Sequence, residues 1–191
     1  MRGKRTPKSA RARNHVKTVG AGFARSLALE MTRAATISYG EVVRSLRSLE
    51  REYVPQLDDH PKFARELRRR IAEKLLEQAI FHGCKLSVCR ARLNAATRLG
   101  FTDVEQSAHY RLLYAKGAFA RGHKRVAYRT ATAVASDLEQ SLRRSRKNLL
   151  GKHLLKLTRE YLDHIRKPEG EGRQRNGNRS RRSTADLRNN V

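Results

Sequence analysis

The sequence has few of the residues that cross-link a small fold or interrupt its secondary structure. Of its 191 residues, two are cysteine, four are proline and none is tryptophan. The two cysteines, Cys84 and Cys89, cannot supply the disulfide framework that is typical of small secreted proteins. We therefore expect an intracellular protein that folds in a reducing compartment.

Long apolar runs and alternating apolar–polar runs are also missing. No stretch approaches the roughly 18 consecutive apolar residues that a membrane-spanning helix needs. The first apolar positions are interrupted by arginine and glycine, unlike those of a secretory signal. No segment shows the two-residue alternation that is typical of strands. We expect neither a membrane partner nor a β-sheet.

Acidic residues are scarce beside basic ones. The chain has 43 Lys and Arg against 18 Asp and Glu, a net charge of +25, yet 38% of its residues are hydrophobic. High net charge with low hydropathy is typical of disorder, but here the apolar residues recur at helical spacing over most of the length. This combination predicts a folded body that presents cations to a polyanion.

Apolar residues recur every three or four positions, which predicts an all-α protein with about seven helices, arranged as a bundle or a short stack of antiparallel hairpins. Ser38 to Glu41 and Thr102 to Glu105 match the capping-box pattern of helix starts. Glycines such as Gly83 and Gly122 are typical helix ends. We place Phe63, Val104 and Leu149 on buried faces. The expected helices cover about 19–37, 38–55, 61–83, 84–99, 102–121, 124–149 and 152–167.

The two ends of the chain differ from the middle. Residues 1–17 hold seven Lys or Arg and no acidic residue. This composition fits a solvated disordered arm, an arm that lies along phosphates, or an organelle transit peptide. Residues 168–191 are rich in Gly, Asn, Arg and Ser, which predicts a basic disordered tail. The helical domain is expected over residues 18–167.

Two helix–break–helix segments resemble each other at an offset of 39 residues. Gly83-Cys84-Lys85 aligns with Gly122-His123-Lys124. The run from Leu113 to Gly122, followed by Ala127, resembles a tetratricopeptide-type hairpin, in which a glycine ends the first helix and a small residue lets the second pack closely. The resemblance covers about residues 84–140 and implies stacked helical hairpins. The offset is longer than that family's repeat, and no proline closes the segment.

Basic residues cluster most strongly near the second of these breaks. Between residues 121 and 156 there are ten Lys or Arg against two acidic residues, a net charge of +8. An ordinary exposed helix face mixes both signs. We therefore predict a surface that contacts phosphates here, and a second, more mixed cluster near residue 68 that also fits a salt-bridged surface. The predicted nucleic-acid-binding residues are Arg121, Lys124, Arg125, Tyr128, Arg129, Arg143, Arg144, Arg146, Lys147, Arg68 and Arg69.

No arrangement of residues suggests catalysis or a cofactor. His82, Cys84 and Cys89 are close in sequence but lack the two close-spaced pairs of a zinc site, so we expect no metal site. No carboxylate pair stands on an apolar face, as acid–base catalysis would need. The Gly-Lys pairs lack the pattern of a phosphate-binding loop.

The sequence therefore predicts a non-catalytic protein that binds RNA or DNA through the backbone with little base specificity. We expect a small helical subunit of a ribonucleoprotein complex, with other protein subunits as further partners. The alternative is a helical-repeat adaptor that binds an acidic protein partner.

Overall fold

The structure is a computed structural model that describes residues 7–145 and 147–166 of the chain, and these residues form an all-α fold, as predicted. Within these ranges there are seven α-helices, a short 3-10 helix and no strand. The elements are α1 (Pro7–Arg33), α2 (Tyr39–Tyr53), η1 (Pro55–Leu57), α3 (Pro61–Phe81), α4 (Leu86–Leu99), α5 (Val104–Ala120), α6 (Lys124–Arg144) and α7 (Leu149–Arg166).

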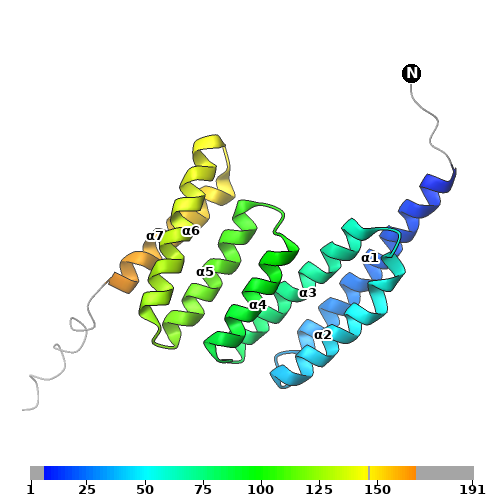
Figure 1. Ribbon diagram of the computed structural model, residues 1–191, viewed down its shortest axis with the longest axis horizontal. Helices are drawn as coiled ribbons and strands as arrows, with labels where there is room; N and C mark the ends of the chain where they lie inside the picture. Colours follow the sequence, from blue (N-terminus) through cyan, green and yellow to red (C-terminus); the bar gives the residue numbers. More distant parts are fainter. Residues whose placement is uncertain (1–6, 146, 167–191) are drawn as a thin grey trace, which may run out of the picture.

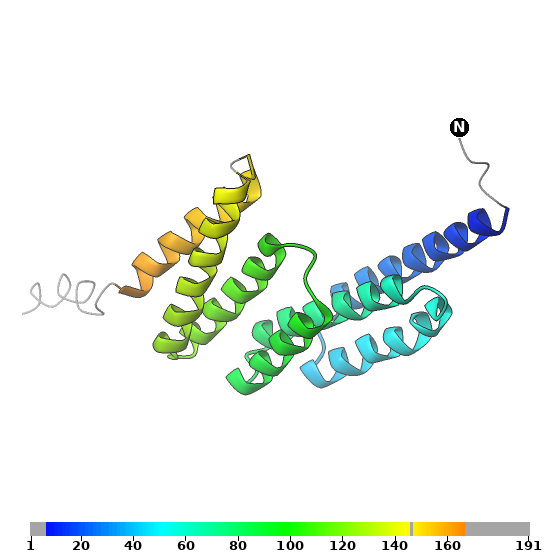
Figure 2. The same ribbon diagram turned by 45° about the horizontal axis from the view of Figure 1, so that its top comes forward.

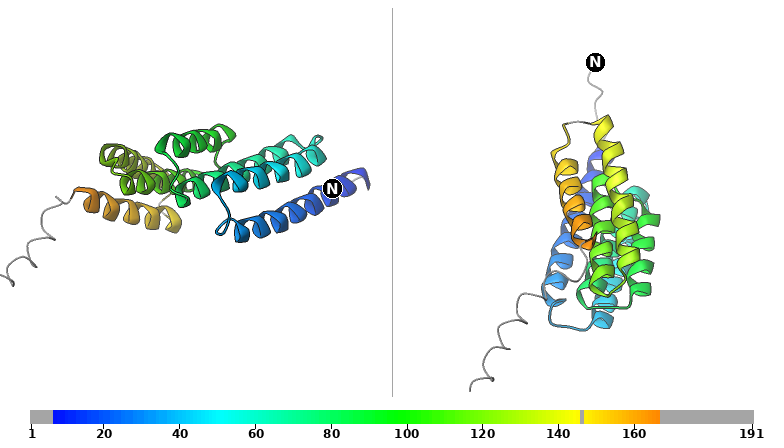
Figure 3. Two further views of the ribbon diagram at one scale, coloured as in Figure 1. Left: turned by 90° about the horizontal axis from the view of Figure 1, so that it is seen from below. Right: turned by 90° about the vertical axis from the view of Figure 1, so that its left-hand side faces the viewer.

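Successive helices run antiparallel and follow one another along the long axis of the molecule (Figure 1). Helices α1 and α2 lie at one end, and α6 and α7 lie at the other (Figure 2). Helix α7 packs on α6 and also touches α5, which closes this end of the stack (Figure 3). In the described part of the chain, no helix has both the length and the apolar character to cross a membrane.

The core consists of three neighbouring clusters instead of one centre. Phe23 and Leu46 belong to a cluster of α1, α2, η1 and the start of α3. Leu76 and Tyr114 belong to a cluster of α3, α4 and α5, and Val134 belongs to a cluster of α5, α6 and α7. Each cluster joins elements that are close in sequence, so packing is mostly local, as in repeat proteins.

The turns after α3 and α5 have the same hydrogen-bond pattern. Gly83 and Gly122 adopt φ angles of 66° and 79°, in the left-handed region that favours glycine. In the first turn the Gly83 and Cys84 amides donate to carbonyls three and five residues back, and Gly122 and His123 do the same in the second. These are Schellman motifs. The two breaks predicted at an offset of 39 residues are therefore alike in geometry, while membership of the tetratricopeptide family stays a prediction.

The first predicted capping box is confirmed and the second is wrong by one residue. The Ser38 hydroxyl accepts from the Glu41 amide at 3.3 Å, and the Glu41 carboxylate accepts from the Ser38 amide at 2.9 Å. At α5, however, Asp103 is the cap and accepts from the Gln106 amide at 2.7 Å. Glu105 does not take part in the cap. It is buried, and its carboxylate accepts from the Asn148 side chain at 2.6 Å.

The ends of α1, α6 and α7 differ most from the sequence prediction, and α1 ends at Arg33 and not near residue 37. Helix α1 begins at Pro7, so part of the arm predicted over 1–17 is helical, while residues 1–6 lie outside the described residues, as does the predicted tail 168–191. Helix α6 ends at Arg144 and α7 begins at Leu149. Asn148 causes this early start, because its side chain accepts from the Gly151 amide at 2.8 Å and so caps α7.

Three apolar residues that we placed on buried faces are exposed. Phe63, Val104 and Leu149 are 50%, 40% and 77% exposed. Each lies in the first turn of its helix, ahead of the residues that pack against a neighbour. The apolar spacing in the sequence therefore extends one helical turn beyond the residues that pack between helices.

A buried polar cluster joins α3 to α5. Arg69 is 5% exposed and donates to Glu66 and, at 2.6 Å, to the Gln106 side chain. Gln106 donates in turn to Glu73 at 2.9 Å, and the Tyr110 hydroxyl lies 3.3 Å from the same carboxylate. Burial raises the pKa of Glu73, and the nearby Arg69 opposes that effect. Arg69, predicted on the nucleic-acid surface, is thus part of the protein interior.

We predict that Arg69→Met lowers the free energy of unfolding by about 3 kcal/mol, because it leaves the buried Glu73 carboxylate without its cation. Arg70→Met is the matched control: Arg70 is the next residue, is exposed and pairs with the same Glu66. Its loss should cost less than about 1 kcal/mol. Urea unfolding of both variants measures the difference, and equal effects would contradict the assigned role of Arg69.

Candidate nucleic-acid interface

The packing of α6 determines which of its residues face solvent. Ala127, Ala131, Val134 and Leu138 are buried on one side of the helix. Helical periodicity places the residues Arg125, Arg129, Thr132, Ser136 and Arg143 on the opposite side. The three arginines are all exposed. We call Arg125, Arg129 and Arg143 the basic face of α6.

The two acidic residues of α6 do not neutralise this face. Asp137 pairs with Arg111 of α5, and Glu139 pairs with Arg159 of α7 at 2.9 Å. Both carboxylates are therefore engaged with cations of neighbouring helices. Within residues 7–145 and 147–166, no carboxylate pairs with any of the three arginines of the basic face, and the same holds for Lys147 in the following turn.

The other predicted residues near α6 lie around this face. Arg144 is exposed and lines a groove of about 540 Å³ between α5 and α6, together with Arg111 and Asp137. Arg146 lies outside the described residues. Lys124 begins α6 and lines a second hollow, next to α7.

Arg121 does not belong to the surface on which we placed it. Its guanidinium donates to three backbone carbonyls, those of Cys84 at 2.9 Å, Gly117 at 2.6 Å and Ile80 at 3.1 Å. It thereby satisfies carbonyl groups at the end of α3 and in the turn that follows. The Ile80 carbonyl also accepts from the Gly83 amide at 3.1 Å, so Arg121 adds a second, charged donor to it. Arg121 therefore joins the turn after α5 to the turn after α3.

The second predicted cluster, on α3, is salt-bridged. Arg68 is about half exposed and lies 3.6 Å from Glu50 of α2, while Arg70 pairs with Glu66 at 3.1 Å. Arg69 is buried in the polar cluster described above. Of the two interpretations left open by the sequence, the structure favours the salt-bridged surface.

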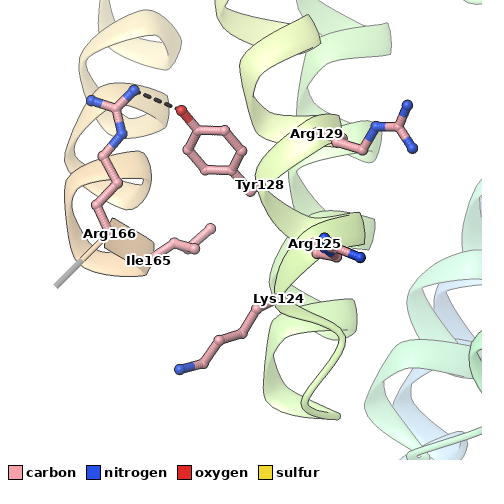
Figure 4. A pocket seen from close by; sticks show the side chains of 6 residues that line it. All are labelled: Lys124, Arg125, Tyr128, Arg129, Ile165 and Arg166. Atoms are coloured by element: carbon pink, nitrogen blue, oxygen red, sulfur yellow. Dashed lines mark hydrogen bonds between the residues drawn. The ribbon is translucent and has the colours of Figure 1, made fainter. Parts of the chain in front are cut away.

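A hollow of about 590 Å³ lies where the start of α6 meets the end of α7. Tyr128 points from α6 toward α7, and Ile165 points back toward α6 (Figure 4). Arg125 and Arg129 lie on the side of α6 away from α7 (Figure 4). Tyr128 and Ile165 thus face each other in the hollow, Arg166 lies above and Lys124 below them in this view, and Arg125 and Arg129 line the hollow from α6.

Arg166 contacts Tyr128 in two ways. Its guanidinium donates to the Tyr128 hydroxyl at 2.7 Å and lies 5.4 Å from the centre of the ring. This hydrogen bond, and the positive charge that makes it, lower the pKa of Tyr128. Neither Arg166 nor Ile165 was among the predicted site residues, because only the pairing of α6 with α7 brings them to Tyr128.

The residues considered for a metal site have other partners. The His82 ring lies 3.1 Å from the Ala34 carbonyl, and the Cys89 thiol lies 3.7 Å from the Cys84 carbonyl. In the described ranges, no three His, Cys, Asp or Glu side chains are grouped so that they could hold a metal ion.

Comparison with known proteins adds no identification: no family model matches the sequence, and no curated protein or solved structure is significantly similar to it.

We predict that Arg121→Gln destabilises the protein by about 2 kcal/mol, because three partly buried carbonyls lose a charged donor. If Arg121 only joins the two turns, the folded variant should bind nucleic acid as the wild type does. Thermal unfolding and a binding titration well below the melting temperature measure the two effects. If the variant is as stable as the wild type but binds nucleic acid more weakly, Arg121 belongs to the nucleic-acid interface and the structural role assigned to it is wrong.

Proposed function

We propose that this protein binds the phosphate backbone of nucleic acid through the basic face of α6, without catalysing a reaction. The proposal is supported mainly by one observation: Asp137 and Glu139 pair with cations of neighbouring helices. As a result, the arginines of the basic face have no carboxylate partner within the described residues. Such a face repels itself unless a polyanion covers it. Phosphates are the polyanion that arginine contacts best, through two parallel hydrogen bonds.

The spacing of the basic face suits an extended partner. Arg125 and Arg129 are one helical turn apart, and Arg143 follows about 27 Å from Arg125 along the helix axis at about 1.5 Å per residue. Thr132 and Ser136 lie between them and offer short hydroxyl donors, which commonly contact phosphate oxygens. A nucleic-acid strand lying along α6 would meet donors over most of that length.

We infer further that the partner is RNA within a ribonucleoprotein complex that contains other protein subunits. Backbone contacts hold a strand in place but carry little sequence information. A protein that binds in this way depends on the surrounding assembly to select its target. The basic segments 1–6 and 167–191, outside the described residues, would add to the electrostatic attraction.

We predict that replacing Arg125, Arg129, Arg143 and Lys147 together by glutamine weakens RNA binding and flattens its salt dependence. For single strands the slope of log K against log salt changes by about 0.7 for each phosphate that the protein neutralises, so removing four cations should reduce the slope by about 2 to 3. Fluorescence anisotropy titrations over a salt series measure the slope.

The matched control removes the same number and kind of charges from the other end of the stack. Arg25, Arg44, Arg47 and Lys62 are exposed on α1, α2 and α3. Their replacement by glutamine lowers the net charge equally and should change the slope much less. Equal effects of the two variants would mean that total charge, and not the α6 face, governs binding. No binding of RNA or DNA by the wild type at low salt would contradict the proposed function itself.

A further inference from the structure

The hollow between α6 and α7 combines a fixed aromatic ring with surrounding cations. It is lined by Lys124, Arg125, Tyr128, Arg129, Ile165 and Arg166. Its volume of about 590 Å³ lies within the range of about 300–1,000 Å³ that is usual for small-molecule sites. Apolar contacts flanked by cations match the chemistry of a nucleotide, which has a flat base and charged phosphates.

Two contacts restrict the ring of Tyr128. Arg166 binds its hydroxyl, and the ring packs against the buried cluster of α5, α6 and α7. Tyr128 is nevertheless only partly buried. A rigid, partly exposed ring is a good stacking surface, because little side-chain entropy is lost when a base lies on it.

The electrostatics of this end of α6 favour an anion. Helix α6 begins without a side-chain cap and without an acidic residue in its first turn. Lys124 and Arg125 occupy that turn, so their charges add to the positive end of the helix dipole. The starts of α3 and α4 also lack a side-chain cap and an acidic residue, whereas Ser38 and Asp103 cap α2 and α5 and a glutamate lies in the first turn of each. A phosphate beside Arg125 would be attracted by the charge of that guanidinium and by the helix dipole.

We infer that this hollow receives one base of a single-stranded nucleic acid, which stacks at Tyr128 while the flanking phosphates contact Arg125 and Arg129. The inference rests on the proposed function and adds a substrate class to it. Bases in a duplex are stacked within the helix and cannot enter, whereas unpaired bases commonly stack on aromatic side chains. The site therefore favours single strands over duplexes.

The test uses the full chain and two substitutions at one position. Tyr128→Leu keeps apolar bulk but removes the aromatic ring, and Tyr128→Phe keeps the ring but removes the hydroxyl that Arg166 binds. The probes are a short single strand of uridine nucleotides, the corresponding deoxyuridine strand, and a blunt-ended RNA duplex without a loop. Titration at constant low salt gives the affinities, and thermal unfolding confirms that each variant is folded.

We expect Tyr128→Leu to weaken binding of the single strands by about tenfold, since stacking on one aromatic ring contributes about 1–3 kcal/mol per base. Tyr128→Phe should retain most of the affinity, and duplex binding should be unchanged by either substitution. Weaker binding by Tyr128→Leu to the uridine strand alone, or to both single strands, supports the site. The difference between the two strands shows whether the ribose hydroxyl contributes to binding.

The inference is overturned if Tyr128→Leu binds single strands as tightly as the wild type does, or loses duplex affinity to the same extent. In that event the glutamine variant of the basic face and Lys147 still decides the proposed function separately. If that variant weakens binding while Tyr128→Leu does not, backbone binding stands and the base-stacking site is wrong.

Discussion

Close packing of α6 against α5 and α7 is the constraint on which the rest of the candidate interface depends. Small side chains make this packing possible, since Ala127 and Ala131 of α6 and Ala115 of α5 are completely buried. Moving the buried stripe by one residue would rotate the helix by about 100°. Such a rotation would bring arginines into the interface, where an unpaired charge costs several kcal/mol. The core therefore fixes the direction in which Arg125 and Arg129 point.

The same packing separates the charges of α6 by sign. Asp137 and Glu139 lie between its buried side and its basic face. There they pair with Arg111 of α5 and Arg159 of α7. These partly exposed pairs contribute little to stability individually. Their main consequence is electrostatic, because the outward arginines are left without local compensation. A surface made in this way gains most from a polyanion, and the proposed function follows from that.

Arginine in this chain has two different uses, which the structure distinguishes. Arg69 and Arg121 lie inside the stack, where they join α3 to α5 through carboxylate, amide and backbone carbonyl groups. Arg125 and Arg129 face outward. A high net charge therefore does not measure the size of the binding surface, since some of the cations hold neighbouring hairpins together.

The sequence was sufficient to predict the fold class and the exposed arginines of α6, because both follow from helical periodicity, and the glycine turns, because glycine favours the positive φ angles found there. It was not sufficient for Arg121, whose partners are brought together only when two turns meet across the stack. The same holds for Arg166, which reaches Tyr128 across 38 residues of chain. The start of α7 was missed although Asn148 is a good helix cap, because a glycine more often marks a helix end than a helix interior. Gly151 is in fact buried within the helix.

The central claim is that nucleic acid lies on α6 and the adjoining end of α7. Photocrosslinking measures this most directly: the full chain is bound to an RNA strand that contains thiouridine, irradiated and digested, and the modified peptides are identified by mass spectrometry. Within the described part of the chain, we expect modification mainly in peptides from α6 and from the end of α7, at Tyr128 among other residues. Modification confined to α1, α2 and α3, or to the chain ends outside the described residues, would contradict it.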